Sequence, residues 1–403
     1  MRILHVVTAF PRAPGDIIAP WLVELLRRQR AAGLEVEVFA PAYRGGGNTE
    51  FEGIPVHRFR YFPARWEDLT HDQGTVDRVG RSVRYKLMAP FYVLAGMRAA
   101  WRLARHRHFD IVHVHWPVPH ALFGWAARRG SRGAARLVTL WYGIELRWVK
   151  SRLPWLKQFL KWALKTSDEV VAISSYTARE IAELVHAPAR VIPYGLGFAE
   201  SLPASRDRGA SAGPMHILYV GNLIPRKGVR FLIDALHRLP ASLPAKLTIL
   251  GEGTDRPRLE AQVRELGLHG RVTMPGRVPD PDLHRAFREA TVLVLPSIVD
   301  QRGDTEGLGV VLLEAMSYRI PVIGSAIGGI TDIISDGETG LLVPPEDPAA
   351  IASAIARIAT DSALAERLAA AGSQRVRERF GWDAIIAAWR ECYDAALRSR
   401  PRA

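Results

Sequence analysis

Apolar and polar residues follow two periods that alternate along this chain. Short, mainly apolar runs, such as residues 3–7 and 111–115, are typical of strands buried on both faces of a parallel sheet. Between them lie longer segments, such as residues 20–32, whose apolar side chains recur every three or four positions. That period is typical of helices that cover a sheet. The alternation predicts an α/β fold with helices on both faces of parallel sheets.

The pattern predicts strands and helices in both halves of the chain. Strands are predicted at residues 3–7, 35–40, 56–60, 111–115, 137–140, 170–173, 191–192, 216–220, 246–250, 272–274, 291–295, 321–323 and 341–343. Helices are predicted at residues 20–32, 229–237, 255–266, 281–288, about 308–318 and 382–397. Gly33 fits the position just past the end of a helix, and Thr177 with Glu180 fits a capping box.

Two similar α/β halves predict two Rossmann-like domains with doubly wound parallel sheets. We assign residues 1–195 to an N-terminal domain and residues 215–378 to a C-terminal domain. Residues 196–214 are rich in Ser, Gly, Ala and Pro without an apolar period, and we interpret them as a linker. Residues 379–403 are expected to form a helix that packs back toward the N-terminal domain. Because such sheets bind ligands at the carboxyl ends of their strands, a binding cleft between the domains is expected.

Composition places the chain among soluble globular proteins. It has 403 residues, 48% apolar and 24% charged. The single cysteine excludes an internal disulfide and fits a reducing compartment. The first apolar run is too short for a secretory signal, and residues 87–97 are interrupted by Pro90 and too short to span a bilayer. We therefore expect a cytoplasmic protein that does not cross a membrane by itself.

Positive charge is concentrated in the first half. Residues 1–200 hold 29 Lys and Arg against 17 Asp and Glu, which accounts for nearly all of the net charge of +13. Residues 78–109 carry eight basic residues and no acidic one. In residues 154–165, Lys157, Lys161 and Lys165 share a helical face beside an apolar stripe flanked by two tryptophans. Such basic amphipathic segments suit an anionic membrane surface.

Two readings of residues 154–165 remain open: a membrane contact, or a helix whose apolar stripe faces the domain core while its lysines are solvated. We favour peripheral contact with the inner face of the plasma membrane, which would bring a lipid-linked acceptor to the protein. No nucleic-acid partner is expected, because the chain has no recognised nucleic-acid-reading motif.

Candidate chemistry is densest between Glu306 and Glu314. The helix predicted from about residue 308 places Gly307 and Gly309 at its first turn. There, small residues let an anion approach the free backbone N–H groups of the segment that includes Leu308 and Val310. Glu314 has apolar neighbours, and a charge among them is costly unless a ligand satisfies it.

The spacing of the two carboxylates suggests the ligand. A rise of 1.5 Å per residue puts Glu314 roughly 9 Å along the helix, so the two acids would flank an anion docked at its start. A nucleotide sugar has that layout of ribose, diphosphate and hexose. The alternative is that Glu306 is an ordinary loop residue near the helix start and that Glu314 reaches solvent.

Further candidates follow other predicted strands. Gly221, Asn222, Arg226 and Lys227 lie between a strand and a helix, where adjacent cations suit a diphosphate. Gly15 and Asp16 lie in the turn after the first strand. For each of these segments the alternative is an ordinary surface turn.

Several segments have the order and spacing of one family. They are GNLIPRKG (221–228), LGEG (250–253), PGRVPD (275–280), the run from Glu306 through Glu314, and DGETGLLVPPEDP (336–348). Together with the weaker matches DIVHVHW, VTLWYGIEL and VVAISSYTAREI in the first half, they resemble the family 4 retaining glycosyltransferases of GT-B architecture. The resemblance implies two Rossmann-like domains facing a cleft, a nucleotide-diphosphate sugar as donor, and a saccharide or polyprenyl-linked acceptor.

The resemblance also implies roles. Lys227 would neutralise the donor diphosphate, Glu306 would contact the sugar beside the reacting carbon, and Gly307 to Gly309 would offer N–H groups to the phosphates. Glu314 would hold the ribose hydroxyls, and Arg277 with Val278 would lie along the base. Transfer would retain anomeric configuration without a metal or other cofactor, in the assembly of cell-surface polysaccharide or glycolipid.

The chain departs from the family pattern at several positions. Asn222 stands where the family often has an arginine, so that Arg226 becomes the candidate for its phosphate contact. Tyr142 stands where the family has a histidine near the donor sugar, and we count it with Glu306 as a catalytic candidate. The usual asparagine and aspartate of the interdomain strand appear as Tyr194 and Gly197.

Other polar residues leave different readings open. His115 and Glu145 are expected to line the cleft on the acceptor side. His113 and His115 share one face of a strand, where imidazoles of a core or cleft are favoured over metal ligands. Asp280 and Asp282 are interpreted as a turn and a helix N-cap. The alternatives to a transferase are a scaffold that binds nucleotide sugars without turnover, or a phosphorylase or epimerase of the same fold.

Overall fold

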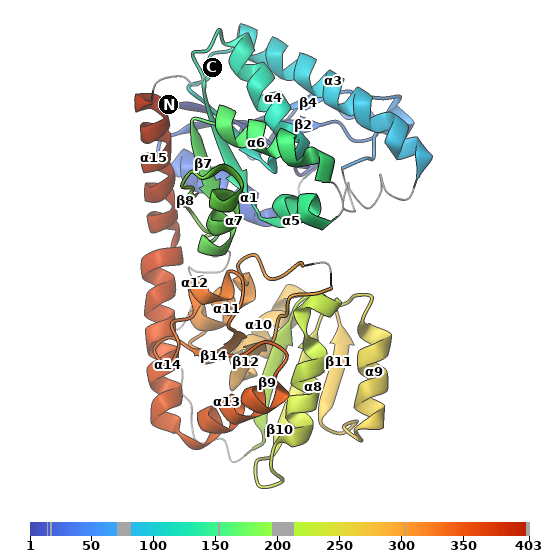
Figure 1. Ribbon diagram of the computed structural model, residues 1–403, viewed down its shortest axis with the longest axis vertical. Coiled ribbons are helices and arrows are strands. Elements are labelled where there is room, and N and C mark those ends of the chain that lie inside the picture. The colour runs from blue at the N-terminus through green and yellow to red at the C-terminus, as the bar shows by residue number, and fades with distance from the viewer. Residues whose placement is uncertain are drawn as a thin grey trace. The chain divides into compact units, whose positions relative to one another are not determined.

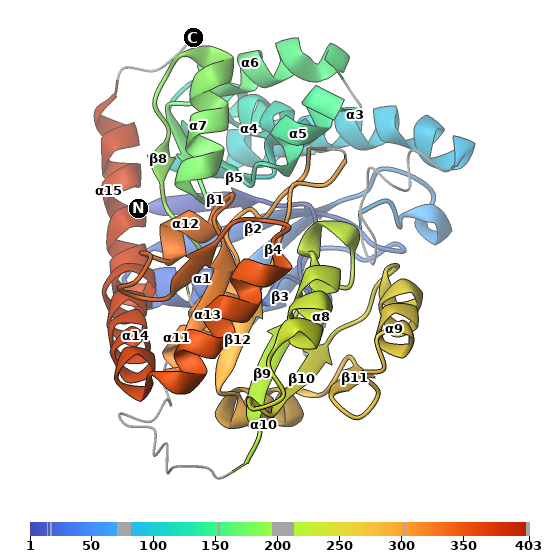
Figure 2. The same ribbon diagram turned by 60° about the horizontal axis from the view of Figure 1, so that its bottom comes forward.

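The computed structural model describes residues 1–13, 15–16, 18–70, 82–151, 154–195, 213–301 and 303–399. The chain divides into two compact units. Unit 1 comprises residues 1–197 and 385–403, and unit 2 comprises residues 198–384. Each unit has its own sheet between helices (Figures 1 and 2). The predicted linker lies outside the described residues except for 213 and 214.

Unit 1 contains a sheet in which every pairing but one is parallel. Its strands are β1 (Arg2–Val6), β2 (Glu35–Pro41), β3 (Thr49–Phe51), β4 (Ile54–Phe59), β5 (Ile111–His115), β6 (Arg136–Trp141), β7 (Glu169–Ala172) and β8 (Arg190–Val191). They follow the order β3-β4-β2-β1-β5-β6-β7-β8. β3 pairs antiparallel with β4 and was not predicted from the sequence. The order reverses between β1 and β5, and such a switch point is where ligands of these sheets bind.

The helices of unit 1 include several whose bounds the sequence pattern did not predict. They are α1 (Pro20–Ala31), α3 (Val83–His106), α4 (Pro117–Gly130), α5 (Ile144–Ser151), α6 (Lys157–Thr166), α7 (Ser175–Val185) and most of α15 (Trp382–Arg398), with short 3-10 turns η1 (Ala64–Trp66) and η2 (Pro154–Leu156). The long helix α3 contains Pro90, which had been interpreted as an interruption. Pro90 has no N–H group to donate to the Lys86 carbonyl. Because Pro90 is exposed, water can satisfy that carbonyl instead.

Two predictions about helix ends have different outcomes. Gly33 follows the end of α1 with φ of 81°, as expected for the position past a helix terminus. The capping box at Thr177 is wrong. α7 is capped by Ser174, whose side chain accepts a hydrogen bond from the Thr177 backbone N–H. Glu180 instead pairs with Arg147 in a buried contact of 3.3 Å.

Unit 2 has an entirely parallel sheet of the Rossmann order. Its strands are β9 (Met215–Val220), β10 (Ala245–Leu250), β11 (Val272–Gly276), β12 (Val292–Leu295), β13 (Val322–Ser325) and β14 (Leu341–Val343). The order is β11-β10-β9-β12-β13-β14, which reverses between β9 and β12. The predicted strands of both units agree with the structure to within two residues at each end.

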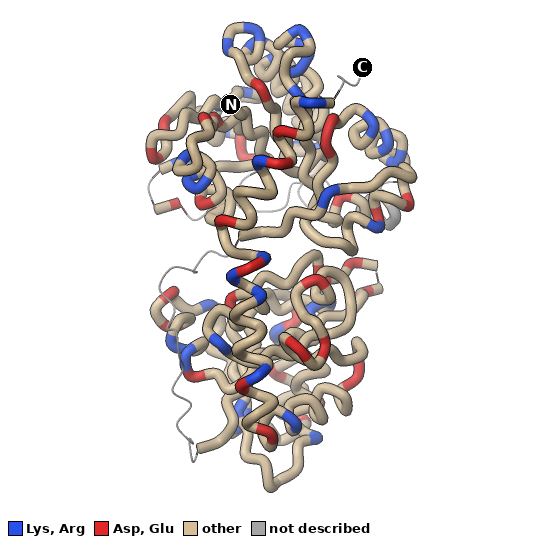
Figure 3. The backbone as a smooth tube through the Cα atoms, turned by 90° about the vertical axis from the view of Figure 1, so that its left-hand side faces the viewer, with Lys and Arg blue, Asp and Glu red and all other residues tan. Residues whose placement is uncertain are grey.

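The helices of unit 2 fill the connections between strands. They are η3 (Pro225–Lys227), α8 (Val229–Arg238), α9 (Arg256–Glu265), α10 (Asp280–Glu289), α11 (Val310–Ser317), α12 (Ile330–Ile333), α13 (Pro348–Thr360), α14 (Ser362–Arg375) and a π-helical turn η4 (Val376–Phe380). Asp347 and Asp361 cap α13 and α14 through their side chains. Acidic and basic positions intermingle over this unit (Figure 3).

The apolar stripe of residues 154–165 packs against the core, whereas Trp155 before it is exposed. In α6, Leu160, Ala163 and Leu164 are almost completely buried and pack beside Trp141. The reading in which the apolar stripe faces the core therefore holds for α6, and its stripe is not free to contact a membrane. Within the described part of the chain, no helix has both the length and the apolar character needed to cross a bilayer.

Candidate active site

Glu306 and Lys227 meet at the switch point of the unit 2 sheet. β9 leads into the loop that carries Lys227, and its neighbour β12 leads into the loop that carries Glu306. Parallel neighbouring strands bring their carboxyl ends to one edge. Two residues 79 positions apart in sequence therefore form an ion pair between Lys227 Nζ and Glu306 Oε2.

The Glu306 carboxylate is buried and has three hydrogen-bonding partners. Besides Lys227, Arg226 donates through Nη1 at 3.3 Å and Ser297 through Oγ at 3.4 Å. Arg226 also lies 3.5 Å from Asp304 through Nε. The two cations predicted to hold a diphosphate are thus placed beside the carboxylate predicted to contact the sugar.

Electrostatics keep Glu306 ionised despite its burial. Desolvation alone would raise its pKa, but the charges of Lys227 and Arg226 outweigh that effect and lower the pKa below its ordinary value. Tyr219, also buried, lies close enough for the charge of Glu306 to add to the burial that raises the pKa of its hydroxyl. Glu306 therefore acts as a carboxylate and not as a proton donor in this state.

The backbone around these residues requires glycine at two positions. Gly228 has φ of 65°, and a Cβ there would lie 1.9 Å from the Pro296 carbonyl oxygen, so that the two loops can approach only without a side chain. Gly309 has φ of 92° and precedes α11. The helix begins at Val310, two residues later than predicted, and the free N–H groups of its first turn lie just beyond Glu306.

Glu314 lies in α11 with part of its side chain accessible to solvent. Burial raises its pKa to about 7, and no other cause contributes to the shift. In the free protein the ionised form of this carboxyl group is therefore destabilised by burial. A ligand that donates hydrogen bonds to its ionised form would offset that cost.

The other predicted donor residues lie at the same edge of the sheet. Gly221 and Asn222 follow β9, and Arg277 with Val278 follows β11, two strands away. The side chain of Asn222 is exposed, and the backbone carbonyl of Asn222 accepts a hydrogen bond from the Tyr219 hydroxyl at 3.1 Å. Arg277 is exposed and Val278 is half-buried. Gly307 and Leu308 form the loop between Glu306 and the start of α11.

Unit 1 carries the remaining candidates. Gly15 and Asp16 lie after β1, and Asp16 is paired with Arg12 at 2.7 Å, which lowers the pKa of the carboxyl against the effect of burial. Tyr142 and Glu145 follow β6, where Glu145 Oε1 accepts a hydrogen bond from the Tyr142 N–H at 3.1 Å. Burial raises the pKa of Glu145 to about 7.

Asp280 and Asp282 of unit 2 lie in the first turn of α10, and Asp282 pairs with Arg285.

The Tyr142 hydroxyl is hydrogen-bonded to one histidine, which is hydrogen-bonded to a second. It lies 3.0 Å from His115 Nδ1, and His115 Nε2 lies 3.1 Å from His5 Nδ1. On the far side of the same group, His113 Nδ1 lies 2.9 Å from the Tyr393 hydroxyl, which accepts a hydrogen bond from Gln29. Burial lowers the pKa of all three imidazoles, that of His5 to about 3, so each is neutral.

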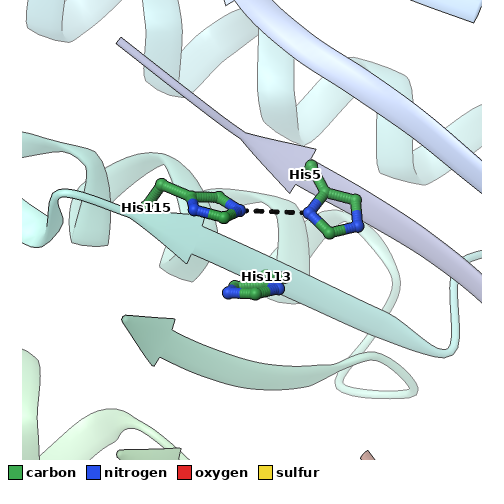
Figure 4. A group of neighbouring side chains, drawn as sticks. All are labelled: His5, His113 and His115. Carbon is green, nitrogen blue, oxygen red and sulfur yellow. Dashed lines mark hydrogen bonds between the residues drawn. The ribbon is translucent and has the colours of Figure 1, made fainter. Parts of the chain in front are cut away.

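His113 and His115 are stacked, and His5 lies beside them and is hydrogen-bonded to His115 (Figure 4). One nitrogen of each lies within 4.8 Å of the others, a spacing that suggests a metal site. A metal must lie in the plane of each imidazole, along the nitrogen lone pair. The rings of His113 and His115 are only 19° from parallel with centroids 4.2 Å apart, so their lone pairs do not converge on one ion. We interpret the group as a neutral hydrogen-bonded network.

An aromatic group around Tyr142 was not predicted. Trp116 stacks on Tyr142 with ring centroids 4.6 Å apart, and Trp21 contacts Tyr142, Tyr194 and His115 at 5.0 to 5.9 Å. Trp21, Trp116 and Tyr194 are partly exposed. Aromatic faces of this kind pack against the apolar faces of sugar rings. A sequence signal was present for two of them, since Trp116 and Tyr194 follow predicted strands, whereas Trp21 lies in a predicted helix.

Tyr142→Phe is expected to lower the free energy of unfolding by about 1–3 kcal/mol, because His115 Nδ1 loses its buried partner. If Tyr142 serves catalysis, the turnover number falls as well. Tyr393→Phe is the matched control, since it breaks an equivalent bond to His113 without touching Tyr142. Thermal unfolding and transfer rates of both variants separate the two effects. Equal losses of activity in both would contradict a specific role for Tyr142.

Known proteins match this chain over nearly its whole length. The family model Glycosyltransferase Family 4 matches residues 19–197, and the model Glycosyl transferases group 1 matches residues 204–375. Glycogen synthase of Mycobacterium tuberculosis is 32% identical over 72% of this chain and 69% of its own length.

Two further matches cover more of the chain. A GDP-mannose-dependent alpha-(1-6)-phosphatidylinositol monomannoside mannosyltransferase of Mycolicibacterium smegmatis is 28% identical over 85% of this chain and 93% of its own. The structure of sucrose-phosphate synthase from Thermosynechococcus elongatus superimposes with a TM-score of 0.75 at 24% identity and covers 98% of both chains.

Proposed function

The chain belongs to the family 4 glycosyltransferases of GT-B architecture, and from this premise we propose that it transfers a sugar with retention of anomeric configuration. It is a glycosyltransferase with a nucleotide-sugar donor. The proposed acceptor is a saccharide or a lipid-linked sugar in the assembly of cell-surface polysaccharide or glycolipid.

The observation that carries the proposal is the contact of Lys227 and Arg226 with Glu306. Transfer breaks the bond between the anomeric carbon and the diphosphate and forms a bond from that carbon to an acceptor oxygen, which loses its proton. Negative charge develops on the departing diphosphate. Lys227, Arg226 and the N–H groups at the start of α11 would stabilise that charge. Glu306 would face the positive charge that develops on the sugar.

The same arrangement supports a donor orientation. With the diphosphate at the first turn of α11, Glu314 lies further along the helix, where the ribose hydroxyls would donate to its carboxylate. Arg277 and Val278, two strands away at the same sheet edge, would then flank the base. We propose that no metal ion is required, because Lys227 and Arg226 supply the positive charge that a divalent ion would otherwise bring to the diphosphate.

The acceptor is proposed to bind unit 1. Trp21 and Trp116 would pack against a sugar ring, with His115 and Glu145 beside Tyr142. The mannosyltransferase of Mycolicibacterium smegmatis acts, by its name, on a phosphatidylinositol monomannoside. That relative supports the proposal of a glycolipid acceptor and of peripheral association with the cytoplasmic membrane surface.

A binding protein without turnover is the second candidate, because Asn222 and Tyr142 replace residues that the family uses. The position of Arg226 weighs against it: Arg226 lies beside Lys227 and Glu306 and can take the phosphate contact that Asn222 lacks. Phosphorolysis on the same fold is the third candidate.

A thermal-shift panel of UDP-, GDP- and ADP-sugars tests the donor assignment. One nucleotide class is expected to stabilise the protein by about 2.7 kcal/mol at a concentration 100 times its dissociation constant. Lys227→Gln should remove most of the shift, whereas Lys246→Gln, an exposed change in β10, should leave it intact.

Turnover then separates the candidates. Nucleoside diphosphate release that depends on added acceptor supports transfer, whereas donor binding without release across an acceptor panel supports the scaffold. Sugar phosphate formed from an oligosaccharide and inorganic phosphate supports phosphorolysis. The absence of a shift with every nucleotide sugar would refute the donor site.

A further inference from the structure

One face of α3 exposes large apolar side chains to solvent. Val83, Leu87, Phe91 and Leu94 are between 56% and 69% exposed, and Trp101 further along the helix is 37% exposed. These positions are four or three residues apart, so at 100° per residue they form one stripe along the helix. Single exposed apolar residues are common, but a contiguous stripe marks an interaction site.

Packing on the opposite face fixes the orientation of this stripe. Met88, Tyr92, Gly96, Ala100 and Ala104 are buried at intervals of four residues. The small residues among them allow close contact with α4, since a Cβ on Gly96 would lie 2.4 Å from the Phe123 ring. The helix cannot rotate to bury its outer stripe without losing this contact. In Figures 1 and 2 the N-terminal end of α3 extends beyond the neighbouring helices of unit 1.

Positive charge continues the stripe toward the C-terminal end of the helix. Arg98, Arg102 and Arg105 are exposed there, and residues 83–106 contain no acidic residue. Arg105 lies over the Trp101 ring at 5.1 Å. The stripe is thus apolar from Val83 to Leu94, with exposed Arg84 and Lys86 beside it, and mainly basic further along.

Aromatic and basic residues from a neighbouring loop extend the apolar end. Phe62 contacts Phe91 and Trp66, with ring centroids 5.6 and 5.8 Å apart. Trp66 is 37% exposed and has Arg65 and Arg84 over its ring. Tryptophan and arginine combine an apolar body with a polar tip, which suits the boundary between acyl chains and headgroups.

We propose that α3 is the membrane-docking element of this protein, with its apolar stripe among the lipids of an anionic bilayer and its arginines on the headgroups. A second copy of the chain fits this face less well, because it would place the same arginines against one another without acids to pair them. The proposal deepens the proposed function by naming the surface through which a lipid-linked acceptor is met.

The contrast with α6 makes the proposal specific. Both helices are basic and contain tryptophan, but the apolar residues of α6 pack into the core, whereas those of α3 face outward. The apolar residues of α6 are therefore not available for contact with lipid, whereas those of α3 are. The sequence had offered both segments for membrane contact, residues 154–165 and the basic segment that contains α3, and the exposed apolar stripe favours the second.

The test measures binding of the full-length protein to sucrose-loaded vesicles in the absence of donor and acceptor. Vesicles of phosphatidylcholine alone are compared with vesicles that contain phosphatidylglycerol. The variant Leu87→Ser/Phe91→Ser/Leu94→Ser is expected to bind anionic vesicles at least ~100-fold more weakly, since each lost apolar contact reduces the partition coefficient several-fold. Arg98→Gln/Arg102→Gln/Arg105→Gln should weaken binding ~10-fold or more and reduce its dependence on salt.

Matched variants control for composition. Val191→Ser/Leu397→Ser removes exposed apolar side chains elsewhere in unit 1, and Lys157→Gln/Lys161→Gln/Lys165→Gln removes charge from α6. Both should bind nearly as wild type. Because the changed α3 residues are exposed, unfolding temperatures should stay unchanged, and transfer to a water-soluble acceptor should be retained.

The outcomes are distinct. Wild-type protein that does not bind anionic vesicles overturns the docking proposal but leaves the transferase proposal intact, because no turnover enters the measurement. Loss of binding in the α6 variant with retention in the α3 variant transfers the role to α6 and also overturns it. A dimer in solution that the Leu87→Ser/Phe91→Ser/Leu94→Ser variant dissociates, without vesicle binding by either, assigns the stripe to self-association instead.

Discussion

Glu306→Gln is expected to reduce the transfer rate by about 10³-fold, the upper range for removal of one preorganised charge beside a reacting centre. The amide keeps the shape of the side chain but not the negative charge that we propose to face the anomeric carbon. Donor binding should survive or improve, because Lys227 and Arg226 are freed from the carboxylate that now occupies them. Nucleoside diphosphate release and a thermal-shift titration with the donor measure the two quantities separately.

The matched control is Glu289→Gln, an exposed residue at the end of α10. It should leave both quantities unchanged. Circular dichroism should show that Glu306→Gln keeps the native fold, since Arg226 still has Asp304 as a partner. Turnover at the wild-type rate in this variant would remove Glu306 from the reaction.

Glu314→Gln is expected to stabilise the free protein while weakening donor binding. The folded-state pKa of Glu314 is about 7, above its ordinary value of 4.5. Below pH 4.5 the carboxyl is protonated in both the folded and unfolded states and has no effect on stability. As the pH rises, the unfolded state ionises first, so the residue destabilises the fold progressively until about pH 7.

The difference in stability between the variant and wild type should therefore be near zero at pH 4 and grow to about 2–3 kcal/mol at pH 8. Donor affinity should fall roughly 10-fold or more, because in the proposed donor orientation the ribose hydroxyls lose a charged acceptor. Chemical denaturation at several pH values and donor titration measure both effects. Glu265→Gln, exposed at the end of α9, is the control. An equal stability difference at pH 4 and pH 8 would contradict the assignment of the raised pKa to Glu314.

The sequence predicted the sheets well because parallel strands are buried on both faces. Residues 111–115 and 292–295 are almost wholly buried, and a continuous apolar run has few alternatives to such a strand. Helix boundaries were predicted less well where a backbone conformation decides them. The left-handed conformation of Gly309 delays α11 by two residues, and Ser174 caps α7 although Thr177 had the better motif.

The bounds of helix α3 were not predicted, although its residues had been grouped with the basic amphipathic segments. Its outer face is apolar at one end, so residues 87–97 have no polar face to reveal the helical period, and Pro90 suggested a break. The same property that concealed the helix is the one that suggests its docking role. Predicting a helix from the period of its apolar residues assumes that the outer face is polar because it contacts solvent. The prediction fails for a helix whose outer face is apolar.

The candidate site was predicted in part. Lys227 and Glu306 were both named from the sequence, but their direct contact depends on β9 and β12 being neighbours, which no local pattern reveals. His5 shows the same limit. His113 and His115 were placed on one face from their spacing, whereas His5 joins them only because β1 pairs with β5 in the register His5 to His113.

The end of the chain completes the core of its beginning. Tyr393 and Trp389 in α15 pack against His113, and Gln29 donates its hydrogen bond to Tyr393. Unit 2 lies wholly between the two segments of unit 1 in the sequence. During synthesis, unit 2 can therefore fold as soon as it leaves the ribosome, whereas the buried histidines of unit 1 must wait until α15 is translated. The unit encoded in the middle of the sequence can thus reach its native fold before the unit that begins first.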